Sequence, residues 1–189
     1  MAGYQIAAVR TLHEGWAKYL KLTIRRPQGD TMEREVEDHG AATAVLAFDP
    51  EGRTALLVRQ FRAAVFHAGG PPTVLETIAG LLDEDDPEAC VRREAHEEVG
   101  LDLRVVERVA TVWSMPGIST ERMHLFLGRY RPSDRVGEGG GLADEHEDIE
   151  VVEIPLADLW ALAEKGEIQD IKTLVLVQAL KLRHPELFV

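Results

Sequence analysis

Residues 87–99 (PEACVRREAHEEV) constrain the fold most, because they predict one helix whose acidic residues are not all on its polar side. Asp86 can cap this helix at its start, and Gly100 can end it. With about 100° between successive residues, Glu94 and Glu98 fall inside the apolar arc of the helix rather than opposite to it. That arc is formed by Cys90, Val91, Ala95 and Val99. The helix is therefore expected to turn two carboxylates toward the interior of the protein.

Glu94 and Glu98 are one helical turn apart, so their side chains are neighbours on this face. Two neighbouring carboxylates on a buried face repel each other and cannot both stay ionised without a cation. A divalent ion with oxygen ligands removes this conflict, and Mg²⁺ is the default because it accepts few carboxylates together with water and phosphate oxygens. The pattern predicts metal-assisted phosphate chemistry. The alternative is a solvated acidic helix face, which would place the acids opposite the apolar residues.

The negative charge of the chain is concentrated in two segments. Of a net charge of −12 over 189 residues, residues 83–98 carry −6 and residues 144–150 carry −5. This segregation indicates two acidic clusters that need a counter-ion, and divalent metal is the usual one. Nucleic acid and anionic membrane are excluded as expected partners, because a protein of this charge repels both at long range.

Cysteine content and hydropathy restrict the class of protein further. The single cysteine, Cys90, excludes an intramolecular disulfide and a cysteine-built metal site, and we expect it to be a small core residue. No apolar run approaches the ~18 residues that a membrane span needs, and the N-terminal residues lack the apolar stretch of a signal peptide. We therefore expect a cytoplasmic protein with one domain and a modest appendage.

The remaining pattern mixes strands with helices. Residues 16–26 and 31–38 read as a hairpin, because residues 27–30 (PQGD) have the composition of a turn. Residues 65–73 are expected to form a loop. Further strands are expected at 41–48, 54–61, 74–79, 104–112, 123–130 and 149–154, and further helices at 156–165 and from about 170 to just before 185. This order predicts an α/β fold with a helix–sheet–helix sandwich.

Residues 80–101 (GLLDEDDPEACVRREAHEEVGL) resemble the Nudix box, G-x5-E-x7-R-E-U-x-E-E-x-G-U, in which U is a bulky apolar residue. The half from Arg93 onward matches, with Ala95 at the first U position. The first half is one residue shorter than usual, and Asp86 or Asp85 replaces its glutamate. Segments outside the box make residues 12–182 similar to the GDP-mannose pyrophosphatase branch of the family. These segments are 114–117 with Glu121, 139–141 before 147–150, and 166–168 with Lys172.

The resemblance implies the Nudix fold, a mixed β-sheet sandwiched between helices, with an N-terminal β-hairpin extension. Residues 1–40 are then the extension, which serves dimerisation, and residues 41–189 are the Nudix hydrolase domain. In the enzymes that this chain resembles, such a hairpin is exchanged between subunits, so the resemblance also implies a homodimer with shared active sites. The implied cofactor is Mg²⁺, with Mn²⁺ as the alternative ion.

The resemblance also assigns roles to individual residues. The implied metal ligands are the backbone carbonyl of Ala79 and the carboxylates of Glu94, Glu98 and Glu147, and the implied catalytic residues are Arg93, Glu97 and Glu98. The implied substrate contacts are Trp16, Glu33, Arg34, Glu35, Arg62, Gly80, Leu81, Glu121 and Lys172. His146 stands where the family has an acid, in a loop two residues longer, so the register of Glu145 and Glu147 stays open. A core or dimer-contact aromatic is the alternative role for Trp16, and a surface salt bridge is the alternative for Arg93.

The implied activity is Mg²⁺-dependent hydrolysis of the diphosphate of a nucleoside diphosphate sugar, with GDP-mannose favoured. The products are a nucleoside monophosphate and a sugar 1-phosphate. An ADP-ribose or ADP-sugar pyrophosphatase is the nearest alternative, since those enzymes share the architecture. A non-catalytic Nudix sensor that only binds a nucleotide sugar is an alternative of another class, and the intact run REAHEE (93–98) disfavours it.

Overall fold

The computed structural model describes residues 3–83, 85–141 and 148–189. The chain divides into two compact units, which are described separately. The first consists of Met1–Ala41 with Val112–Met123, and the second of Ala42–Thr111 with His124–Val189. The first unit therefore includes a segment that the predicted extension, residues 1–40, does not.

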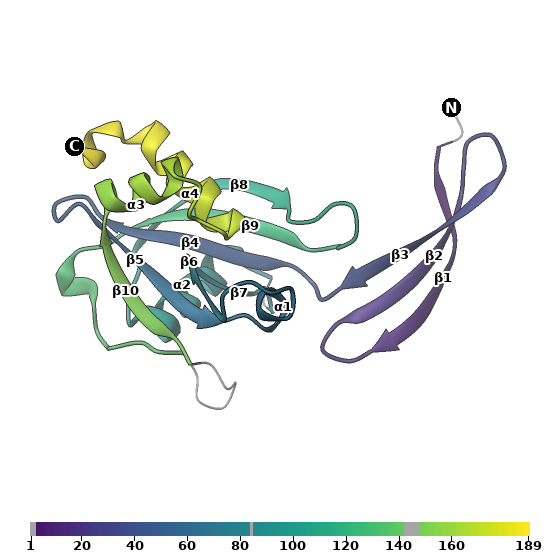
Figure 1. Ribbon diagram of the computed structural model, residues 1–189, viewed down its shortest axis with the longest axis horizontal. Helices are drawn as coiled ribbons and strands as arrows, with labels where there is room; N and C mark the ends of the chain where they lie inside the picture. Colours follow the sequence, from purple (N-terminus) through teal and green to yellow (C-terminus); the bar gives the residue numbers. More distant parts are fainter. Residues whose placement is uncertain (1–2, 84, 142–147) are drawn as a thin grey trace. The chain divides into compact units, whose positions relative to one another are not determined.

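The first unit contains a three-stranded antiparallel sheet of order β1-β2-β3, with strands at Gln5–Glu14, Lys18–Arg25 and Thr31–Asp38 (Figure 1). The hairpin expected at 16–38 corresponds to β2 and β3. Strand β1 was not expected. Its pairing with β2 is irregular between Ile6 and Ala8 and again between Thr11 and His13. Such bulges break the alternation of apolar and polar residues by which a strand is recognised in a sequence.

The second unit is built on a larger sheet. Its strands are β4 (Ala42–Asp49), β5 (Thr54–Phe61), β6 (Thr73–Glu76), β7 (Ile78–Leu81), β8 (Val105–Trp113), β9 (Arg122–Arg129) and β10 (Glu150–Pro155). The end of β8 from Val112 and the start of β9 up to Met123 belong to the first unit. Across the described ranges this is a seven-stranded sheet, in which five strands follow the order β10-β5-β4-β9-β8. The short strands β6 and β7 pair with β5 and β4, respectively.

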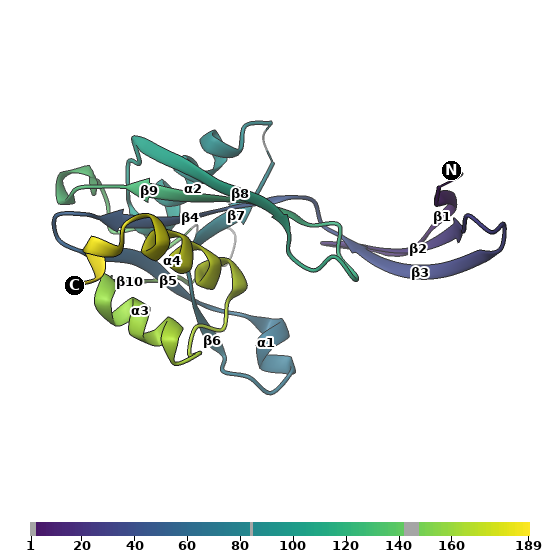
Figure 2. The ribbon, with the colours of Figure 1, turned by 90° about the horizontal axis from the view of Figure 1, so that it is seen from above.

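Helices cover both faces of this sheet, which confirms the predicted sandwich (Figures 1 and 2). The helices are α1 (Ala63–His67), α2 (Pro87–Val99), α3 (Leu156–Glu164) and α4 (Ile171–Arg183), with 3-10 turns at Pro132–Asp134 and Pro185–Phe188. Alternate residues of β4 face opposite sides of the sheet, so Val45 packs with α2 while Phe48 meets His184 after α4. In the described part of the chain, no helix has the length and hydropathy of a membrane span.

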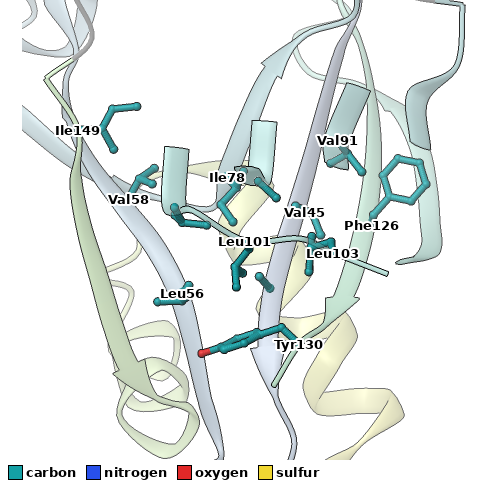
Figure 3. Packing of buried hydrophobic residues seen from close by; sticks show 13 residues of the cluster. Val45, Leu56, Val58, Ile78, Val91, Leu101, Leu103, Phe126, Tyr130 and Ile149 are labelled. Atoms are coloured by element: carbon teal, nitrogen blue, oxygen red, sulfur yellow. The ribbon is translucent and has the colours of Figure 1, made fainter. Parts of the chain in front are cut away.

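The core between the sheet and α2 holds that helix in place (Figure 3). From the sheet it receives Val45, Ala47, Leu56, Val58, Ile78 and Phe126, and from α2 it receives Val91, Ala95 and Val99. Val91, Ala95 and Val99 are fully buried. Three apolar side chains at helical spacing therefore fix the rotation of α2 about its axis.

Both ends of α2 form as the sequence predicts. The side chain of Asp86 accepts a hydrogen bond from the N–H of Glu88, and Pro87 is the first helical residue. Gly100 ends the helix with φ of 67°, and its N–H donates to the carbonyl of His96 at 3.0 Å. A positive φ favours glycine, and a Cβ at this position would also lie too close to the carbonyl of Gly137, so glycine is strongly preferred there.

Two local expectations need correction. The loop expected at 65–73 includes the end of α1, a helix of one turn. The single strand expected at 74–79 is interrupted at Thr77, whose N–H donates to the side-chain oxygen of Thr173 at 2.7 Å instead of to a neighbouring strand. This contact with α4 is long-range, so no pattern within residues 74–79 could reveal it.

Replacing Gly100 by alanine should destabilise the protein for two reasons. The new Cβ would lie 2.3 Å from the carbonyl oxygen of Gly137, and alanine would have to adopt the positive φ of this position. We expect a loss of roughly 2–3 kcal/mol, and a melting temperature lower by about 2–4 °C per kcal/mol. Gly166→Ala is the matched control, since Gly166 has φ of 71° but no atom within 4 Å of its Cβ position. It should cost only about 1 kcal/mol in free energy of unfolding. Equal losses for the two variants would contradict the steric argument.

Candidate functional site

The two glutamates of α2 lie on its inward face. Glu98 is 1% exposed, and the side chain of Glu94 is 12% exposed, whereas His96 lies on the exposed side. The alternative of a solvated acidic face is therefore wrong for these two residues. Because the apolar residues of α2 determine the rotation of the helix, they also determine the direction of both carboxylates.

Both carboxylates lie against the backbone of β7. One carboxylate oxygen of Glu98, Oε2, accepts a hydrogen bond from the N–H of Ala79 at 3.2 Å. A Cβ on Gly80 would lie 2.1 Å from the carboxyl carbon of Glu94, so only glycine leaves room for that side chain. The next residue, Leu81, is the last of the strand, and its carbonyl accepts a hydrogen bond from the thiol of Cys90. Cys90 is fully buried, which confirms that it is a core residue.

The carbonyl of Ala79 faces the same edge as its N–H, because both groups of an extended residue point to one side of a strand. The carboxylates of Glu94 and Glu98 therefore both lie beside residues 79–80 of β7, close to this carbonyl's strand position. Among the described residues, no three His, Cys, Asp or Glu side chains are grouped so that they could hold a metal ion. Glu147 and its alternative Glu145 lie outside the described residues, and their assignment stays a prediction from the sequence.

Arg93 links several carboxylates around this edge. Its guanidinium lies 2.7 Å from Asp83, 3.0 Å from Glu94 and 3.1 Å from Glu97. Its side chain is 33% exposed. Its Nη1 reaches both Glu94 and Glu97 while its Nη2 reaches Asp83, and these contacts restrict the rotamers of the three carboxylates. Arg93 is thus more than an isolated surface ion pair, which was the alternative for this residue.

Two predicted substrate residues, Arg62 and Lys172, meet at a carboxylate that sequence reasoning missed. Arg62 donates from Nε and Nη2 to the two oxygens of Glu76, at 2.6 and 2.9 Å. Lys172 donates to the same carboxylate and to Asp170, the latter at 2.9 Å. Glu76 is only 3% exposed. The structure therefore brings the two cations together from separate parts of the chain.

The pKa of Glu76 reflects this environment. Burial opposes its ionisation, but the hydrogen bond from Arg62 and the positive charge of Lys172 outweigh burial and lower its pKa. Val74, Glu76 and Ile78 are all buried at a spacing of two. An acid at an inward position of an apolar strand was a signal in the sequence that could have identified Glu76.

In the first unit, His39 connects two further predicted substrate residues. Its ring stacks on Trp16 with 5.0 Å between centroids, and its Nε2 lies 3.1 Å from the carboxylate of Glu121. Its Nδ1 lies 2.5 Å from Glu37. Trp16 is 78% exposed, so a core role for it is wrong. An exposed aromatic ring is suited to stack on a nucleotide base, and a carboxylate beside it can accept hydrogen bonds from that base.

The three consecutive substrate candidates on β3 do not share one face of the sheet. Glu33 lies 2.6 Å from Lys21, and Glu35 accepts from the hydroxyl of Tyr19 at 3.0 Å, so both belong to one face. Arg34 alternates to the other face. Glu33 and Glu35 therefore lie on the same face of the sheet, and the side chain of Arg34 lies on the opposite face.

The NUDIX domain family matches residues 38–176 of the chain. Curated relatives named GDP-mannose pyrophosphatase cover most of it. That of Cronobacter sakazakii (strain ATCC BAA-894) is 42% identical over 163 residues, which are 85% of this chain and 84% of the relative. That of Escherichia coli O1:K1 / APEC is 38% identical over 164 residues, 85% of each chain.

A solved structure shows the same fold. The crystal structure of a protein described as an ADP compounds hydrolase has a TM-score of 0.77 to this chain, with 17% sequence identity, and covers 98% of this chain and 96% of its own. At this identity the likeness concerns the fold alone. It confirms the predicted arrangement of a mixed sheet between helices.

The pKa of His39 should lie above its ordinary value of 6.5, because its hydrogen bonds with Glu37 and Glu121 outweigh the opposing effect of burial. A group whose pKa is raised on folding stabilises the fold below its unfolded pKa, and this contribution is lost as pH rises through the folded value. An NMR titration of the ring protons should give a midpoint above 6.5. Glu121→Gln should lower that midpoint, whereas Glu107→Gln, which removes a carboxylate paired with Arg183 and not with His39, should leave it unchanged. A wild-type midpoint at or below 6.5 would contradict the assignment.

Proposed function

This chain belongs to the NUDIX domain family, and from that premise we propose that it hydrolyses the diphosphate of a nucleoside diphosphate sugar, with GDP-mannose as the favoured substrate. The products are a nucleoside monophosphate and a sugar 1-phosphate. The observation that carries the proposal is the packing of Glu94 and Glu98 of α2 against Ala79 and Gly80, in a chain 42% identical to a GDP-mannose pyrophosphatase.

The oxygens along β7 fit a hard divalent cation. NUDIX hydrolases generally use divalent metal ions. We infer Mg²⁺, with Mn²⁺ as the alternative, held by the carbonyl of Ala79 and by Glu94, Glu98 and Glu147. Carboxylates and backbone carbonyls are the donors that such ions prefer, and the described carboxylates repel a diphosphate unless a cation offsets them. When bound, the ion supplies positive charge that neutralises the diphosphate and activates water.

The other residues of the second unit bind and orient the reacting groups. Arg62 offers forked donors to a diphosphate oxygen, Lys172 adds a point charge, and Gly80 and Leu81 offer backbone contacts. Arg93 and Glu97 hold the orientation of the metal-binding carboxylates. As water attacks one phosphorus, Glu98 or an acid of residues 144–148 takes its proton.

The first unit is assigned to nucleotide recognition and dimerisation. Trp16 would stack on the base, and Glu33, Arg34, Glu35 and Glu121 would contact the nucleotide or its sugar. All ten residues of β1 are exposed, including Ile6 at 64% and Val9 at 57%. A small sheet with exposed apolar residues gains stability when a second copy of the chain covers them. We propose a homodimer in which each first unit completes the site of its partner.

A panel of nucleotide sugars tests the choice of substrate. GDP-mannose, ADP-ribose, ADP-glucose and UDP-glucose are each incubated with and without Mg²⁺, and phosphate-containing products are measured. We expect turnover with Mg²⁺ only, and the highest kcat/KM with GDP-mannose. Preference for ADP-ribose or ADP-glucose would favour the alternative pyrophosphatase. Tight binding without turnover of any compound would favour the non-catalytic sensor.

Glu98→Gln should lower kcat by about 10²–10⁴-fold, because it removes a proposed metal ligand and proton acceptor. The variant should be at least as thermostable as wild type in the presence of chelator, since one of two repelling carboxylates is gone. Steady-state rates with Mg²⁺ and melting curves in chelator measure the two effects.

Glu88→Gln is the matched control for this variant, because Glu88 is on the same helix but pairs with Arg92 at 3.5 Å on the exposed side. Its turnover and metal requirement should equal those of wild type. Near wild-type turnover of Glu98→Gln would overturn the assignment of the metal site.

Light scattering should give a mass of about 42 kDa, twice that of the 21.0 kDa chain, if the protein is an isologous dimer. A mass of 21.0 kDa with full activity would contradict the dimer.

Mixing two inactive variants tests whether the sites are shared. Glu98→Gln disables the second unit and Trp16→Ala the first, so a mixed dimer retains one intact site. Random exchange of subunits should restore about a quarter of the wild-type sites. No recovery after verified exchange would place both residues in one subunit's site.

A further inference from the structure

Glu76 occupies an unusual position for a carboxylate. It ends β6, and its side chain is only 4% exposed. An ionised carboxylate at such a position requires cationic partners, because removal from water is strongly unfavourable for an isolated charge. Its partners are Arg62 and Lys172, and these are the two cations proposed to bind the diphosphate.

The two cations come from separate elements and would repel each other without a carboxylate between them. Arg62 precedes α1 and follows β5, whereas Lys172 is in the first turn of α4. A lysine at the start of a helix is also opposed by the positive end of the helix dipole. Asp170, which caps α4, and Glu76 together compensate both cations.

The geometry leaves donors available on Arg62. Nε and Nη2 bind Glu76, while in the part of the chain that the structure describes Nη1 has no hydrogen-bond partner. The Arg62 side chain is 41% exposed, compared with 8% for Lys172. A guanidinium held on one edge by a bidentate carboxylate presents its other edge in a fixed direction.

A second contact fixes the backbone beside Glu76. The N–H of Thr77 donates to the side-chain oxygen of Thr173 at 2.7 Å, and the Thr77 hydroxyl donates to the carbonyl of Val45. The junction between β6 and β7 is therefore tied to both α4 and β4. The backbone position of Glu76 is therefore fixed, so the side chains of Arg62 and Lys172 take the conformations that reach its carboxylate.

We propose that Glu76 is a positioning residue that holds Arg62 and Lys172 at the spacing needed to bind two oxygens of the substrate diphosphate. The proposal rests on the proposed function, because it takes these two cations as diphosphate contacts. Glu76 itself does not touch the substrate. It acts by orienting both donors before the substrate arrives, which reduces the entropy lost on binding.

Binding of inorganic pyrophosphate in the presence of Mg²⁺, measured by calorimetry on the full chain, tests the proposal without assuming any nucleotide. Glu76→Gln should weaken binding by about 10–100-fold, because an amide can accept from one cation but its NH₂ group opposes the other. Steady-state assays should show a higher KM with a smaller change in kcat. Glu107→Gln is the control, since it removes a carboxylate paired with an arginine outside the site, and its binding should equal that of wild type.

A double-mutant cycle separates positioning from general stabilisation. If Glu76 acts through Arg62, Glu76→Gln should weaken binding much less in an Arg62→Ala background than in the wild type. Equal effects in both backgrounds would overturn the proposal, and so would a lower melting temperature with unchanged pyrophosphate affinity. Tighter binding by Glu76→Gln would also overturn it, because Glu76 would then merely compete with phosphate for the cations.

The same cycle distinguishes failure of this proposal from failure of the proposed function. If Arg62→Ala leaves pyrophosphate binding unchanged, the diphosphate site itself is wrongly placed. If Arg62→Ala weakens binding but Glu76→Gln does not, only the role of Glu76 is wrong. Should Glu76→Gln fail to fold, Lys172→Met is compared with Lys172→Met/Glu76→Gln, which removes one charge of each sign. Weaker binding by the double variant supports the proposal, and equal binding contradicts it.

Discussion

The contact of two buried carboxylates with the backbone of β7 is the constraint on which the candidate site depends. Glu98 accepts from the N–H of Ala79, and Glu94 occupies the space beside Gly80 that any side chain there would fill. Neither position is favourable for an isolated charge. The apolar side chains of α2 enforce both positions, because burying them leaves the helix one rotation about its axis. Burial of the apolar residues of α2 thereby holds the two carboxylates close together, and Arg93, 3.0 Å from Glu94, offsets part of their negative charge.

The other charged residues of the candidate site in the second unit lie in contact with residues of opposite charge. Arg93 connects carboxylates along α2 and the loop before it, while Glu76 and Asp170 compensate Arg62 and Lys172. Each group is restrained by opposite charges from other elements. Side chains restrained in this way lose little further entropy on binding a ligand, which favours tight and specific recognition of a charged diphosphate.

The first unit has a different character. Strand β1 is exposed along its whole length, and β2 and β3 have no fully buried residue. Beside Trp16, His39 stacks on the indole ring and contacts Glu37 and Glu121. Small sheets bury too little apolar surface to be stable alone. Such a unit suits a role in which a second copy of the chain or a bound nucleotide supplies the missing contacts, as in the proposed homodimer.

The sequence by itself determined the elements whose signals are local. The caps and the apolar arc of α2 predicted both its bounds and the inward direction of Glu94 and Glu98, and the motif at 93–101 predicted the family. Strand β1 was missed because two bulges break its alternation. Only the tertiary structure decided that Glu76 joins Arg62 to Lys172 and that Thr77 leaves its strand to meet Thr173. These contacts link residues up to 96 positions apart, and a pairing at such separation is set by how the sheet and α4 pack rather than by any local pattern of residues.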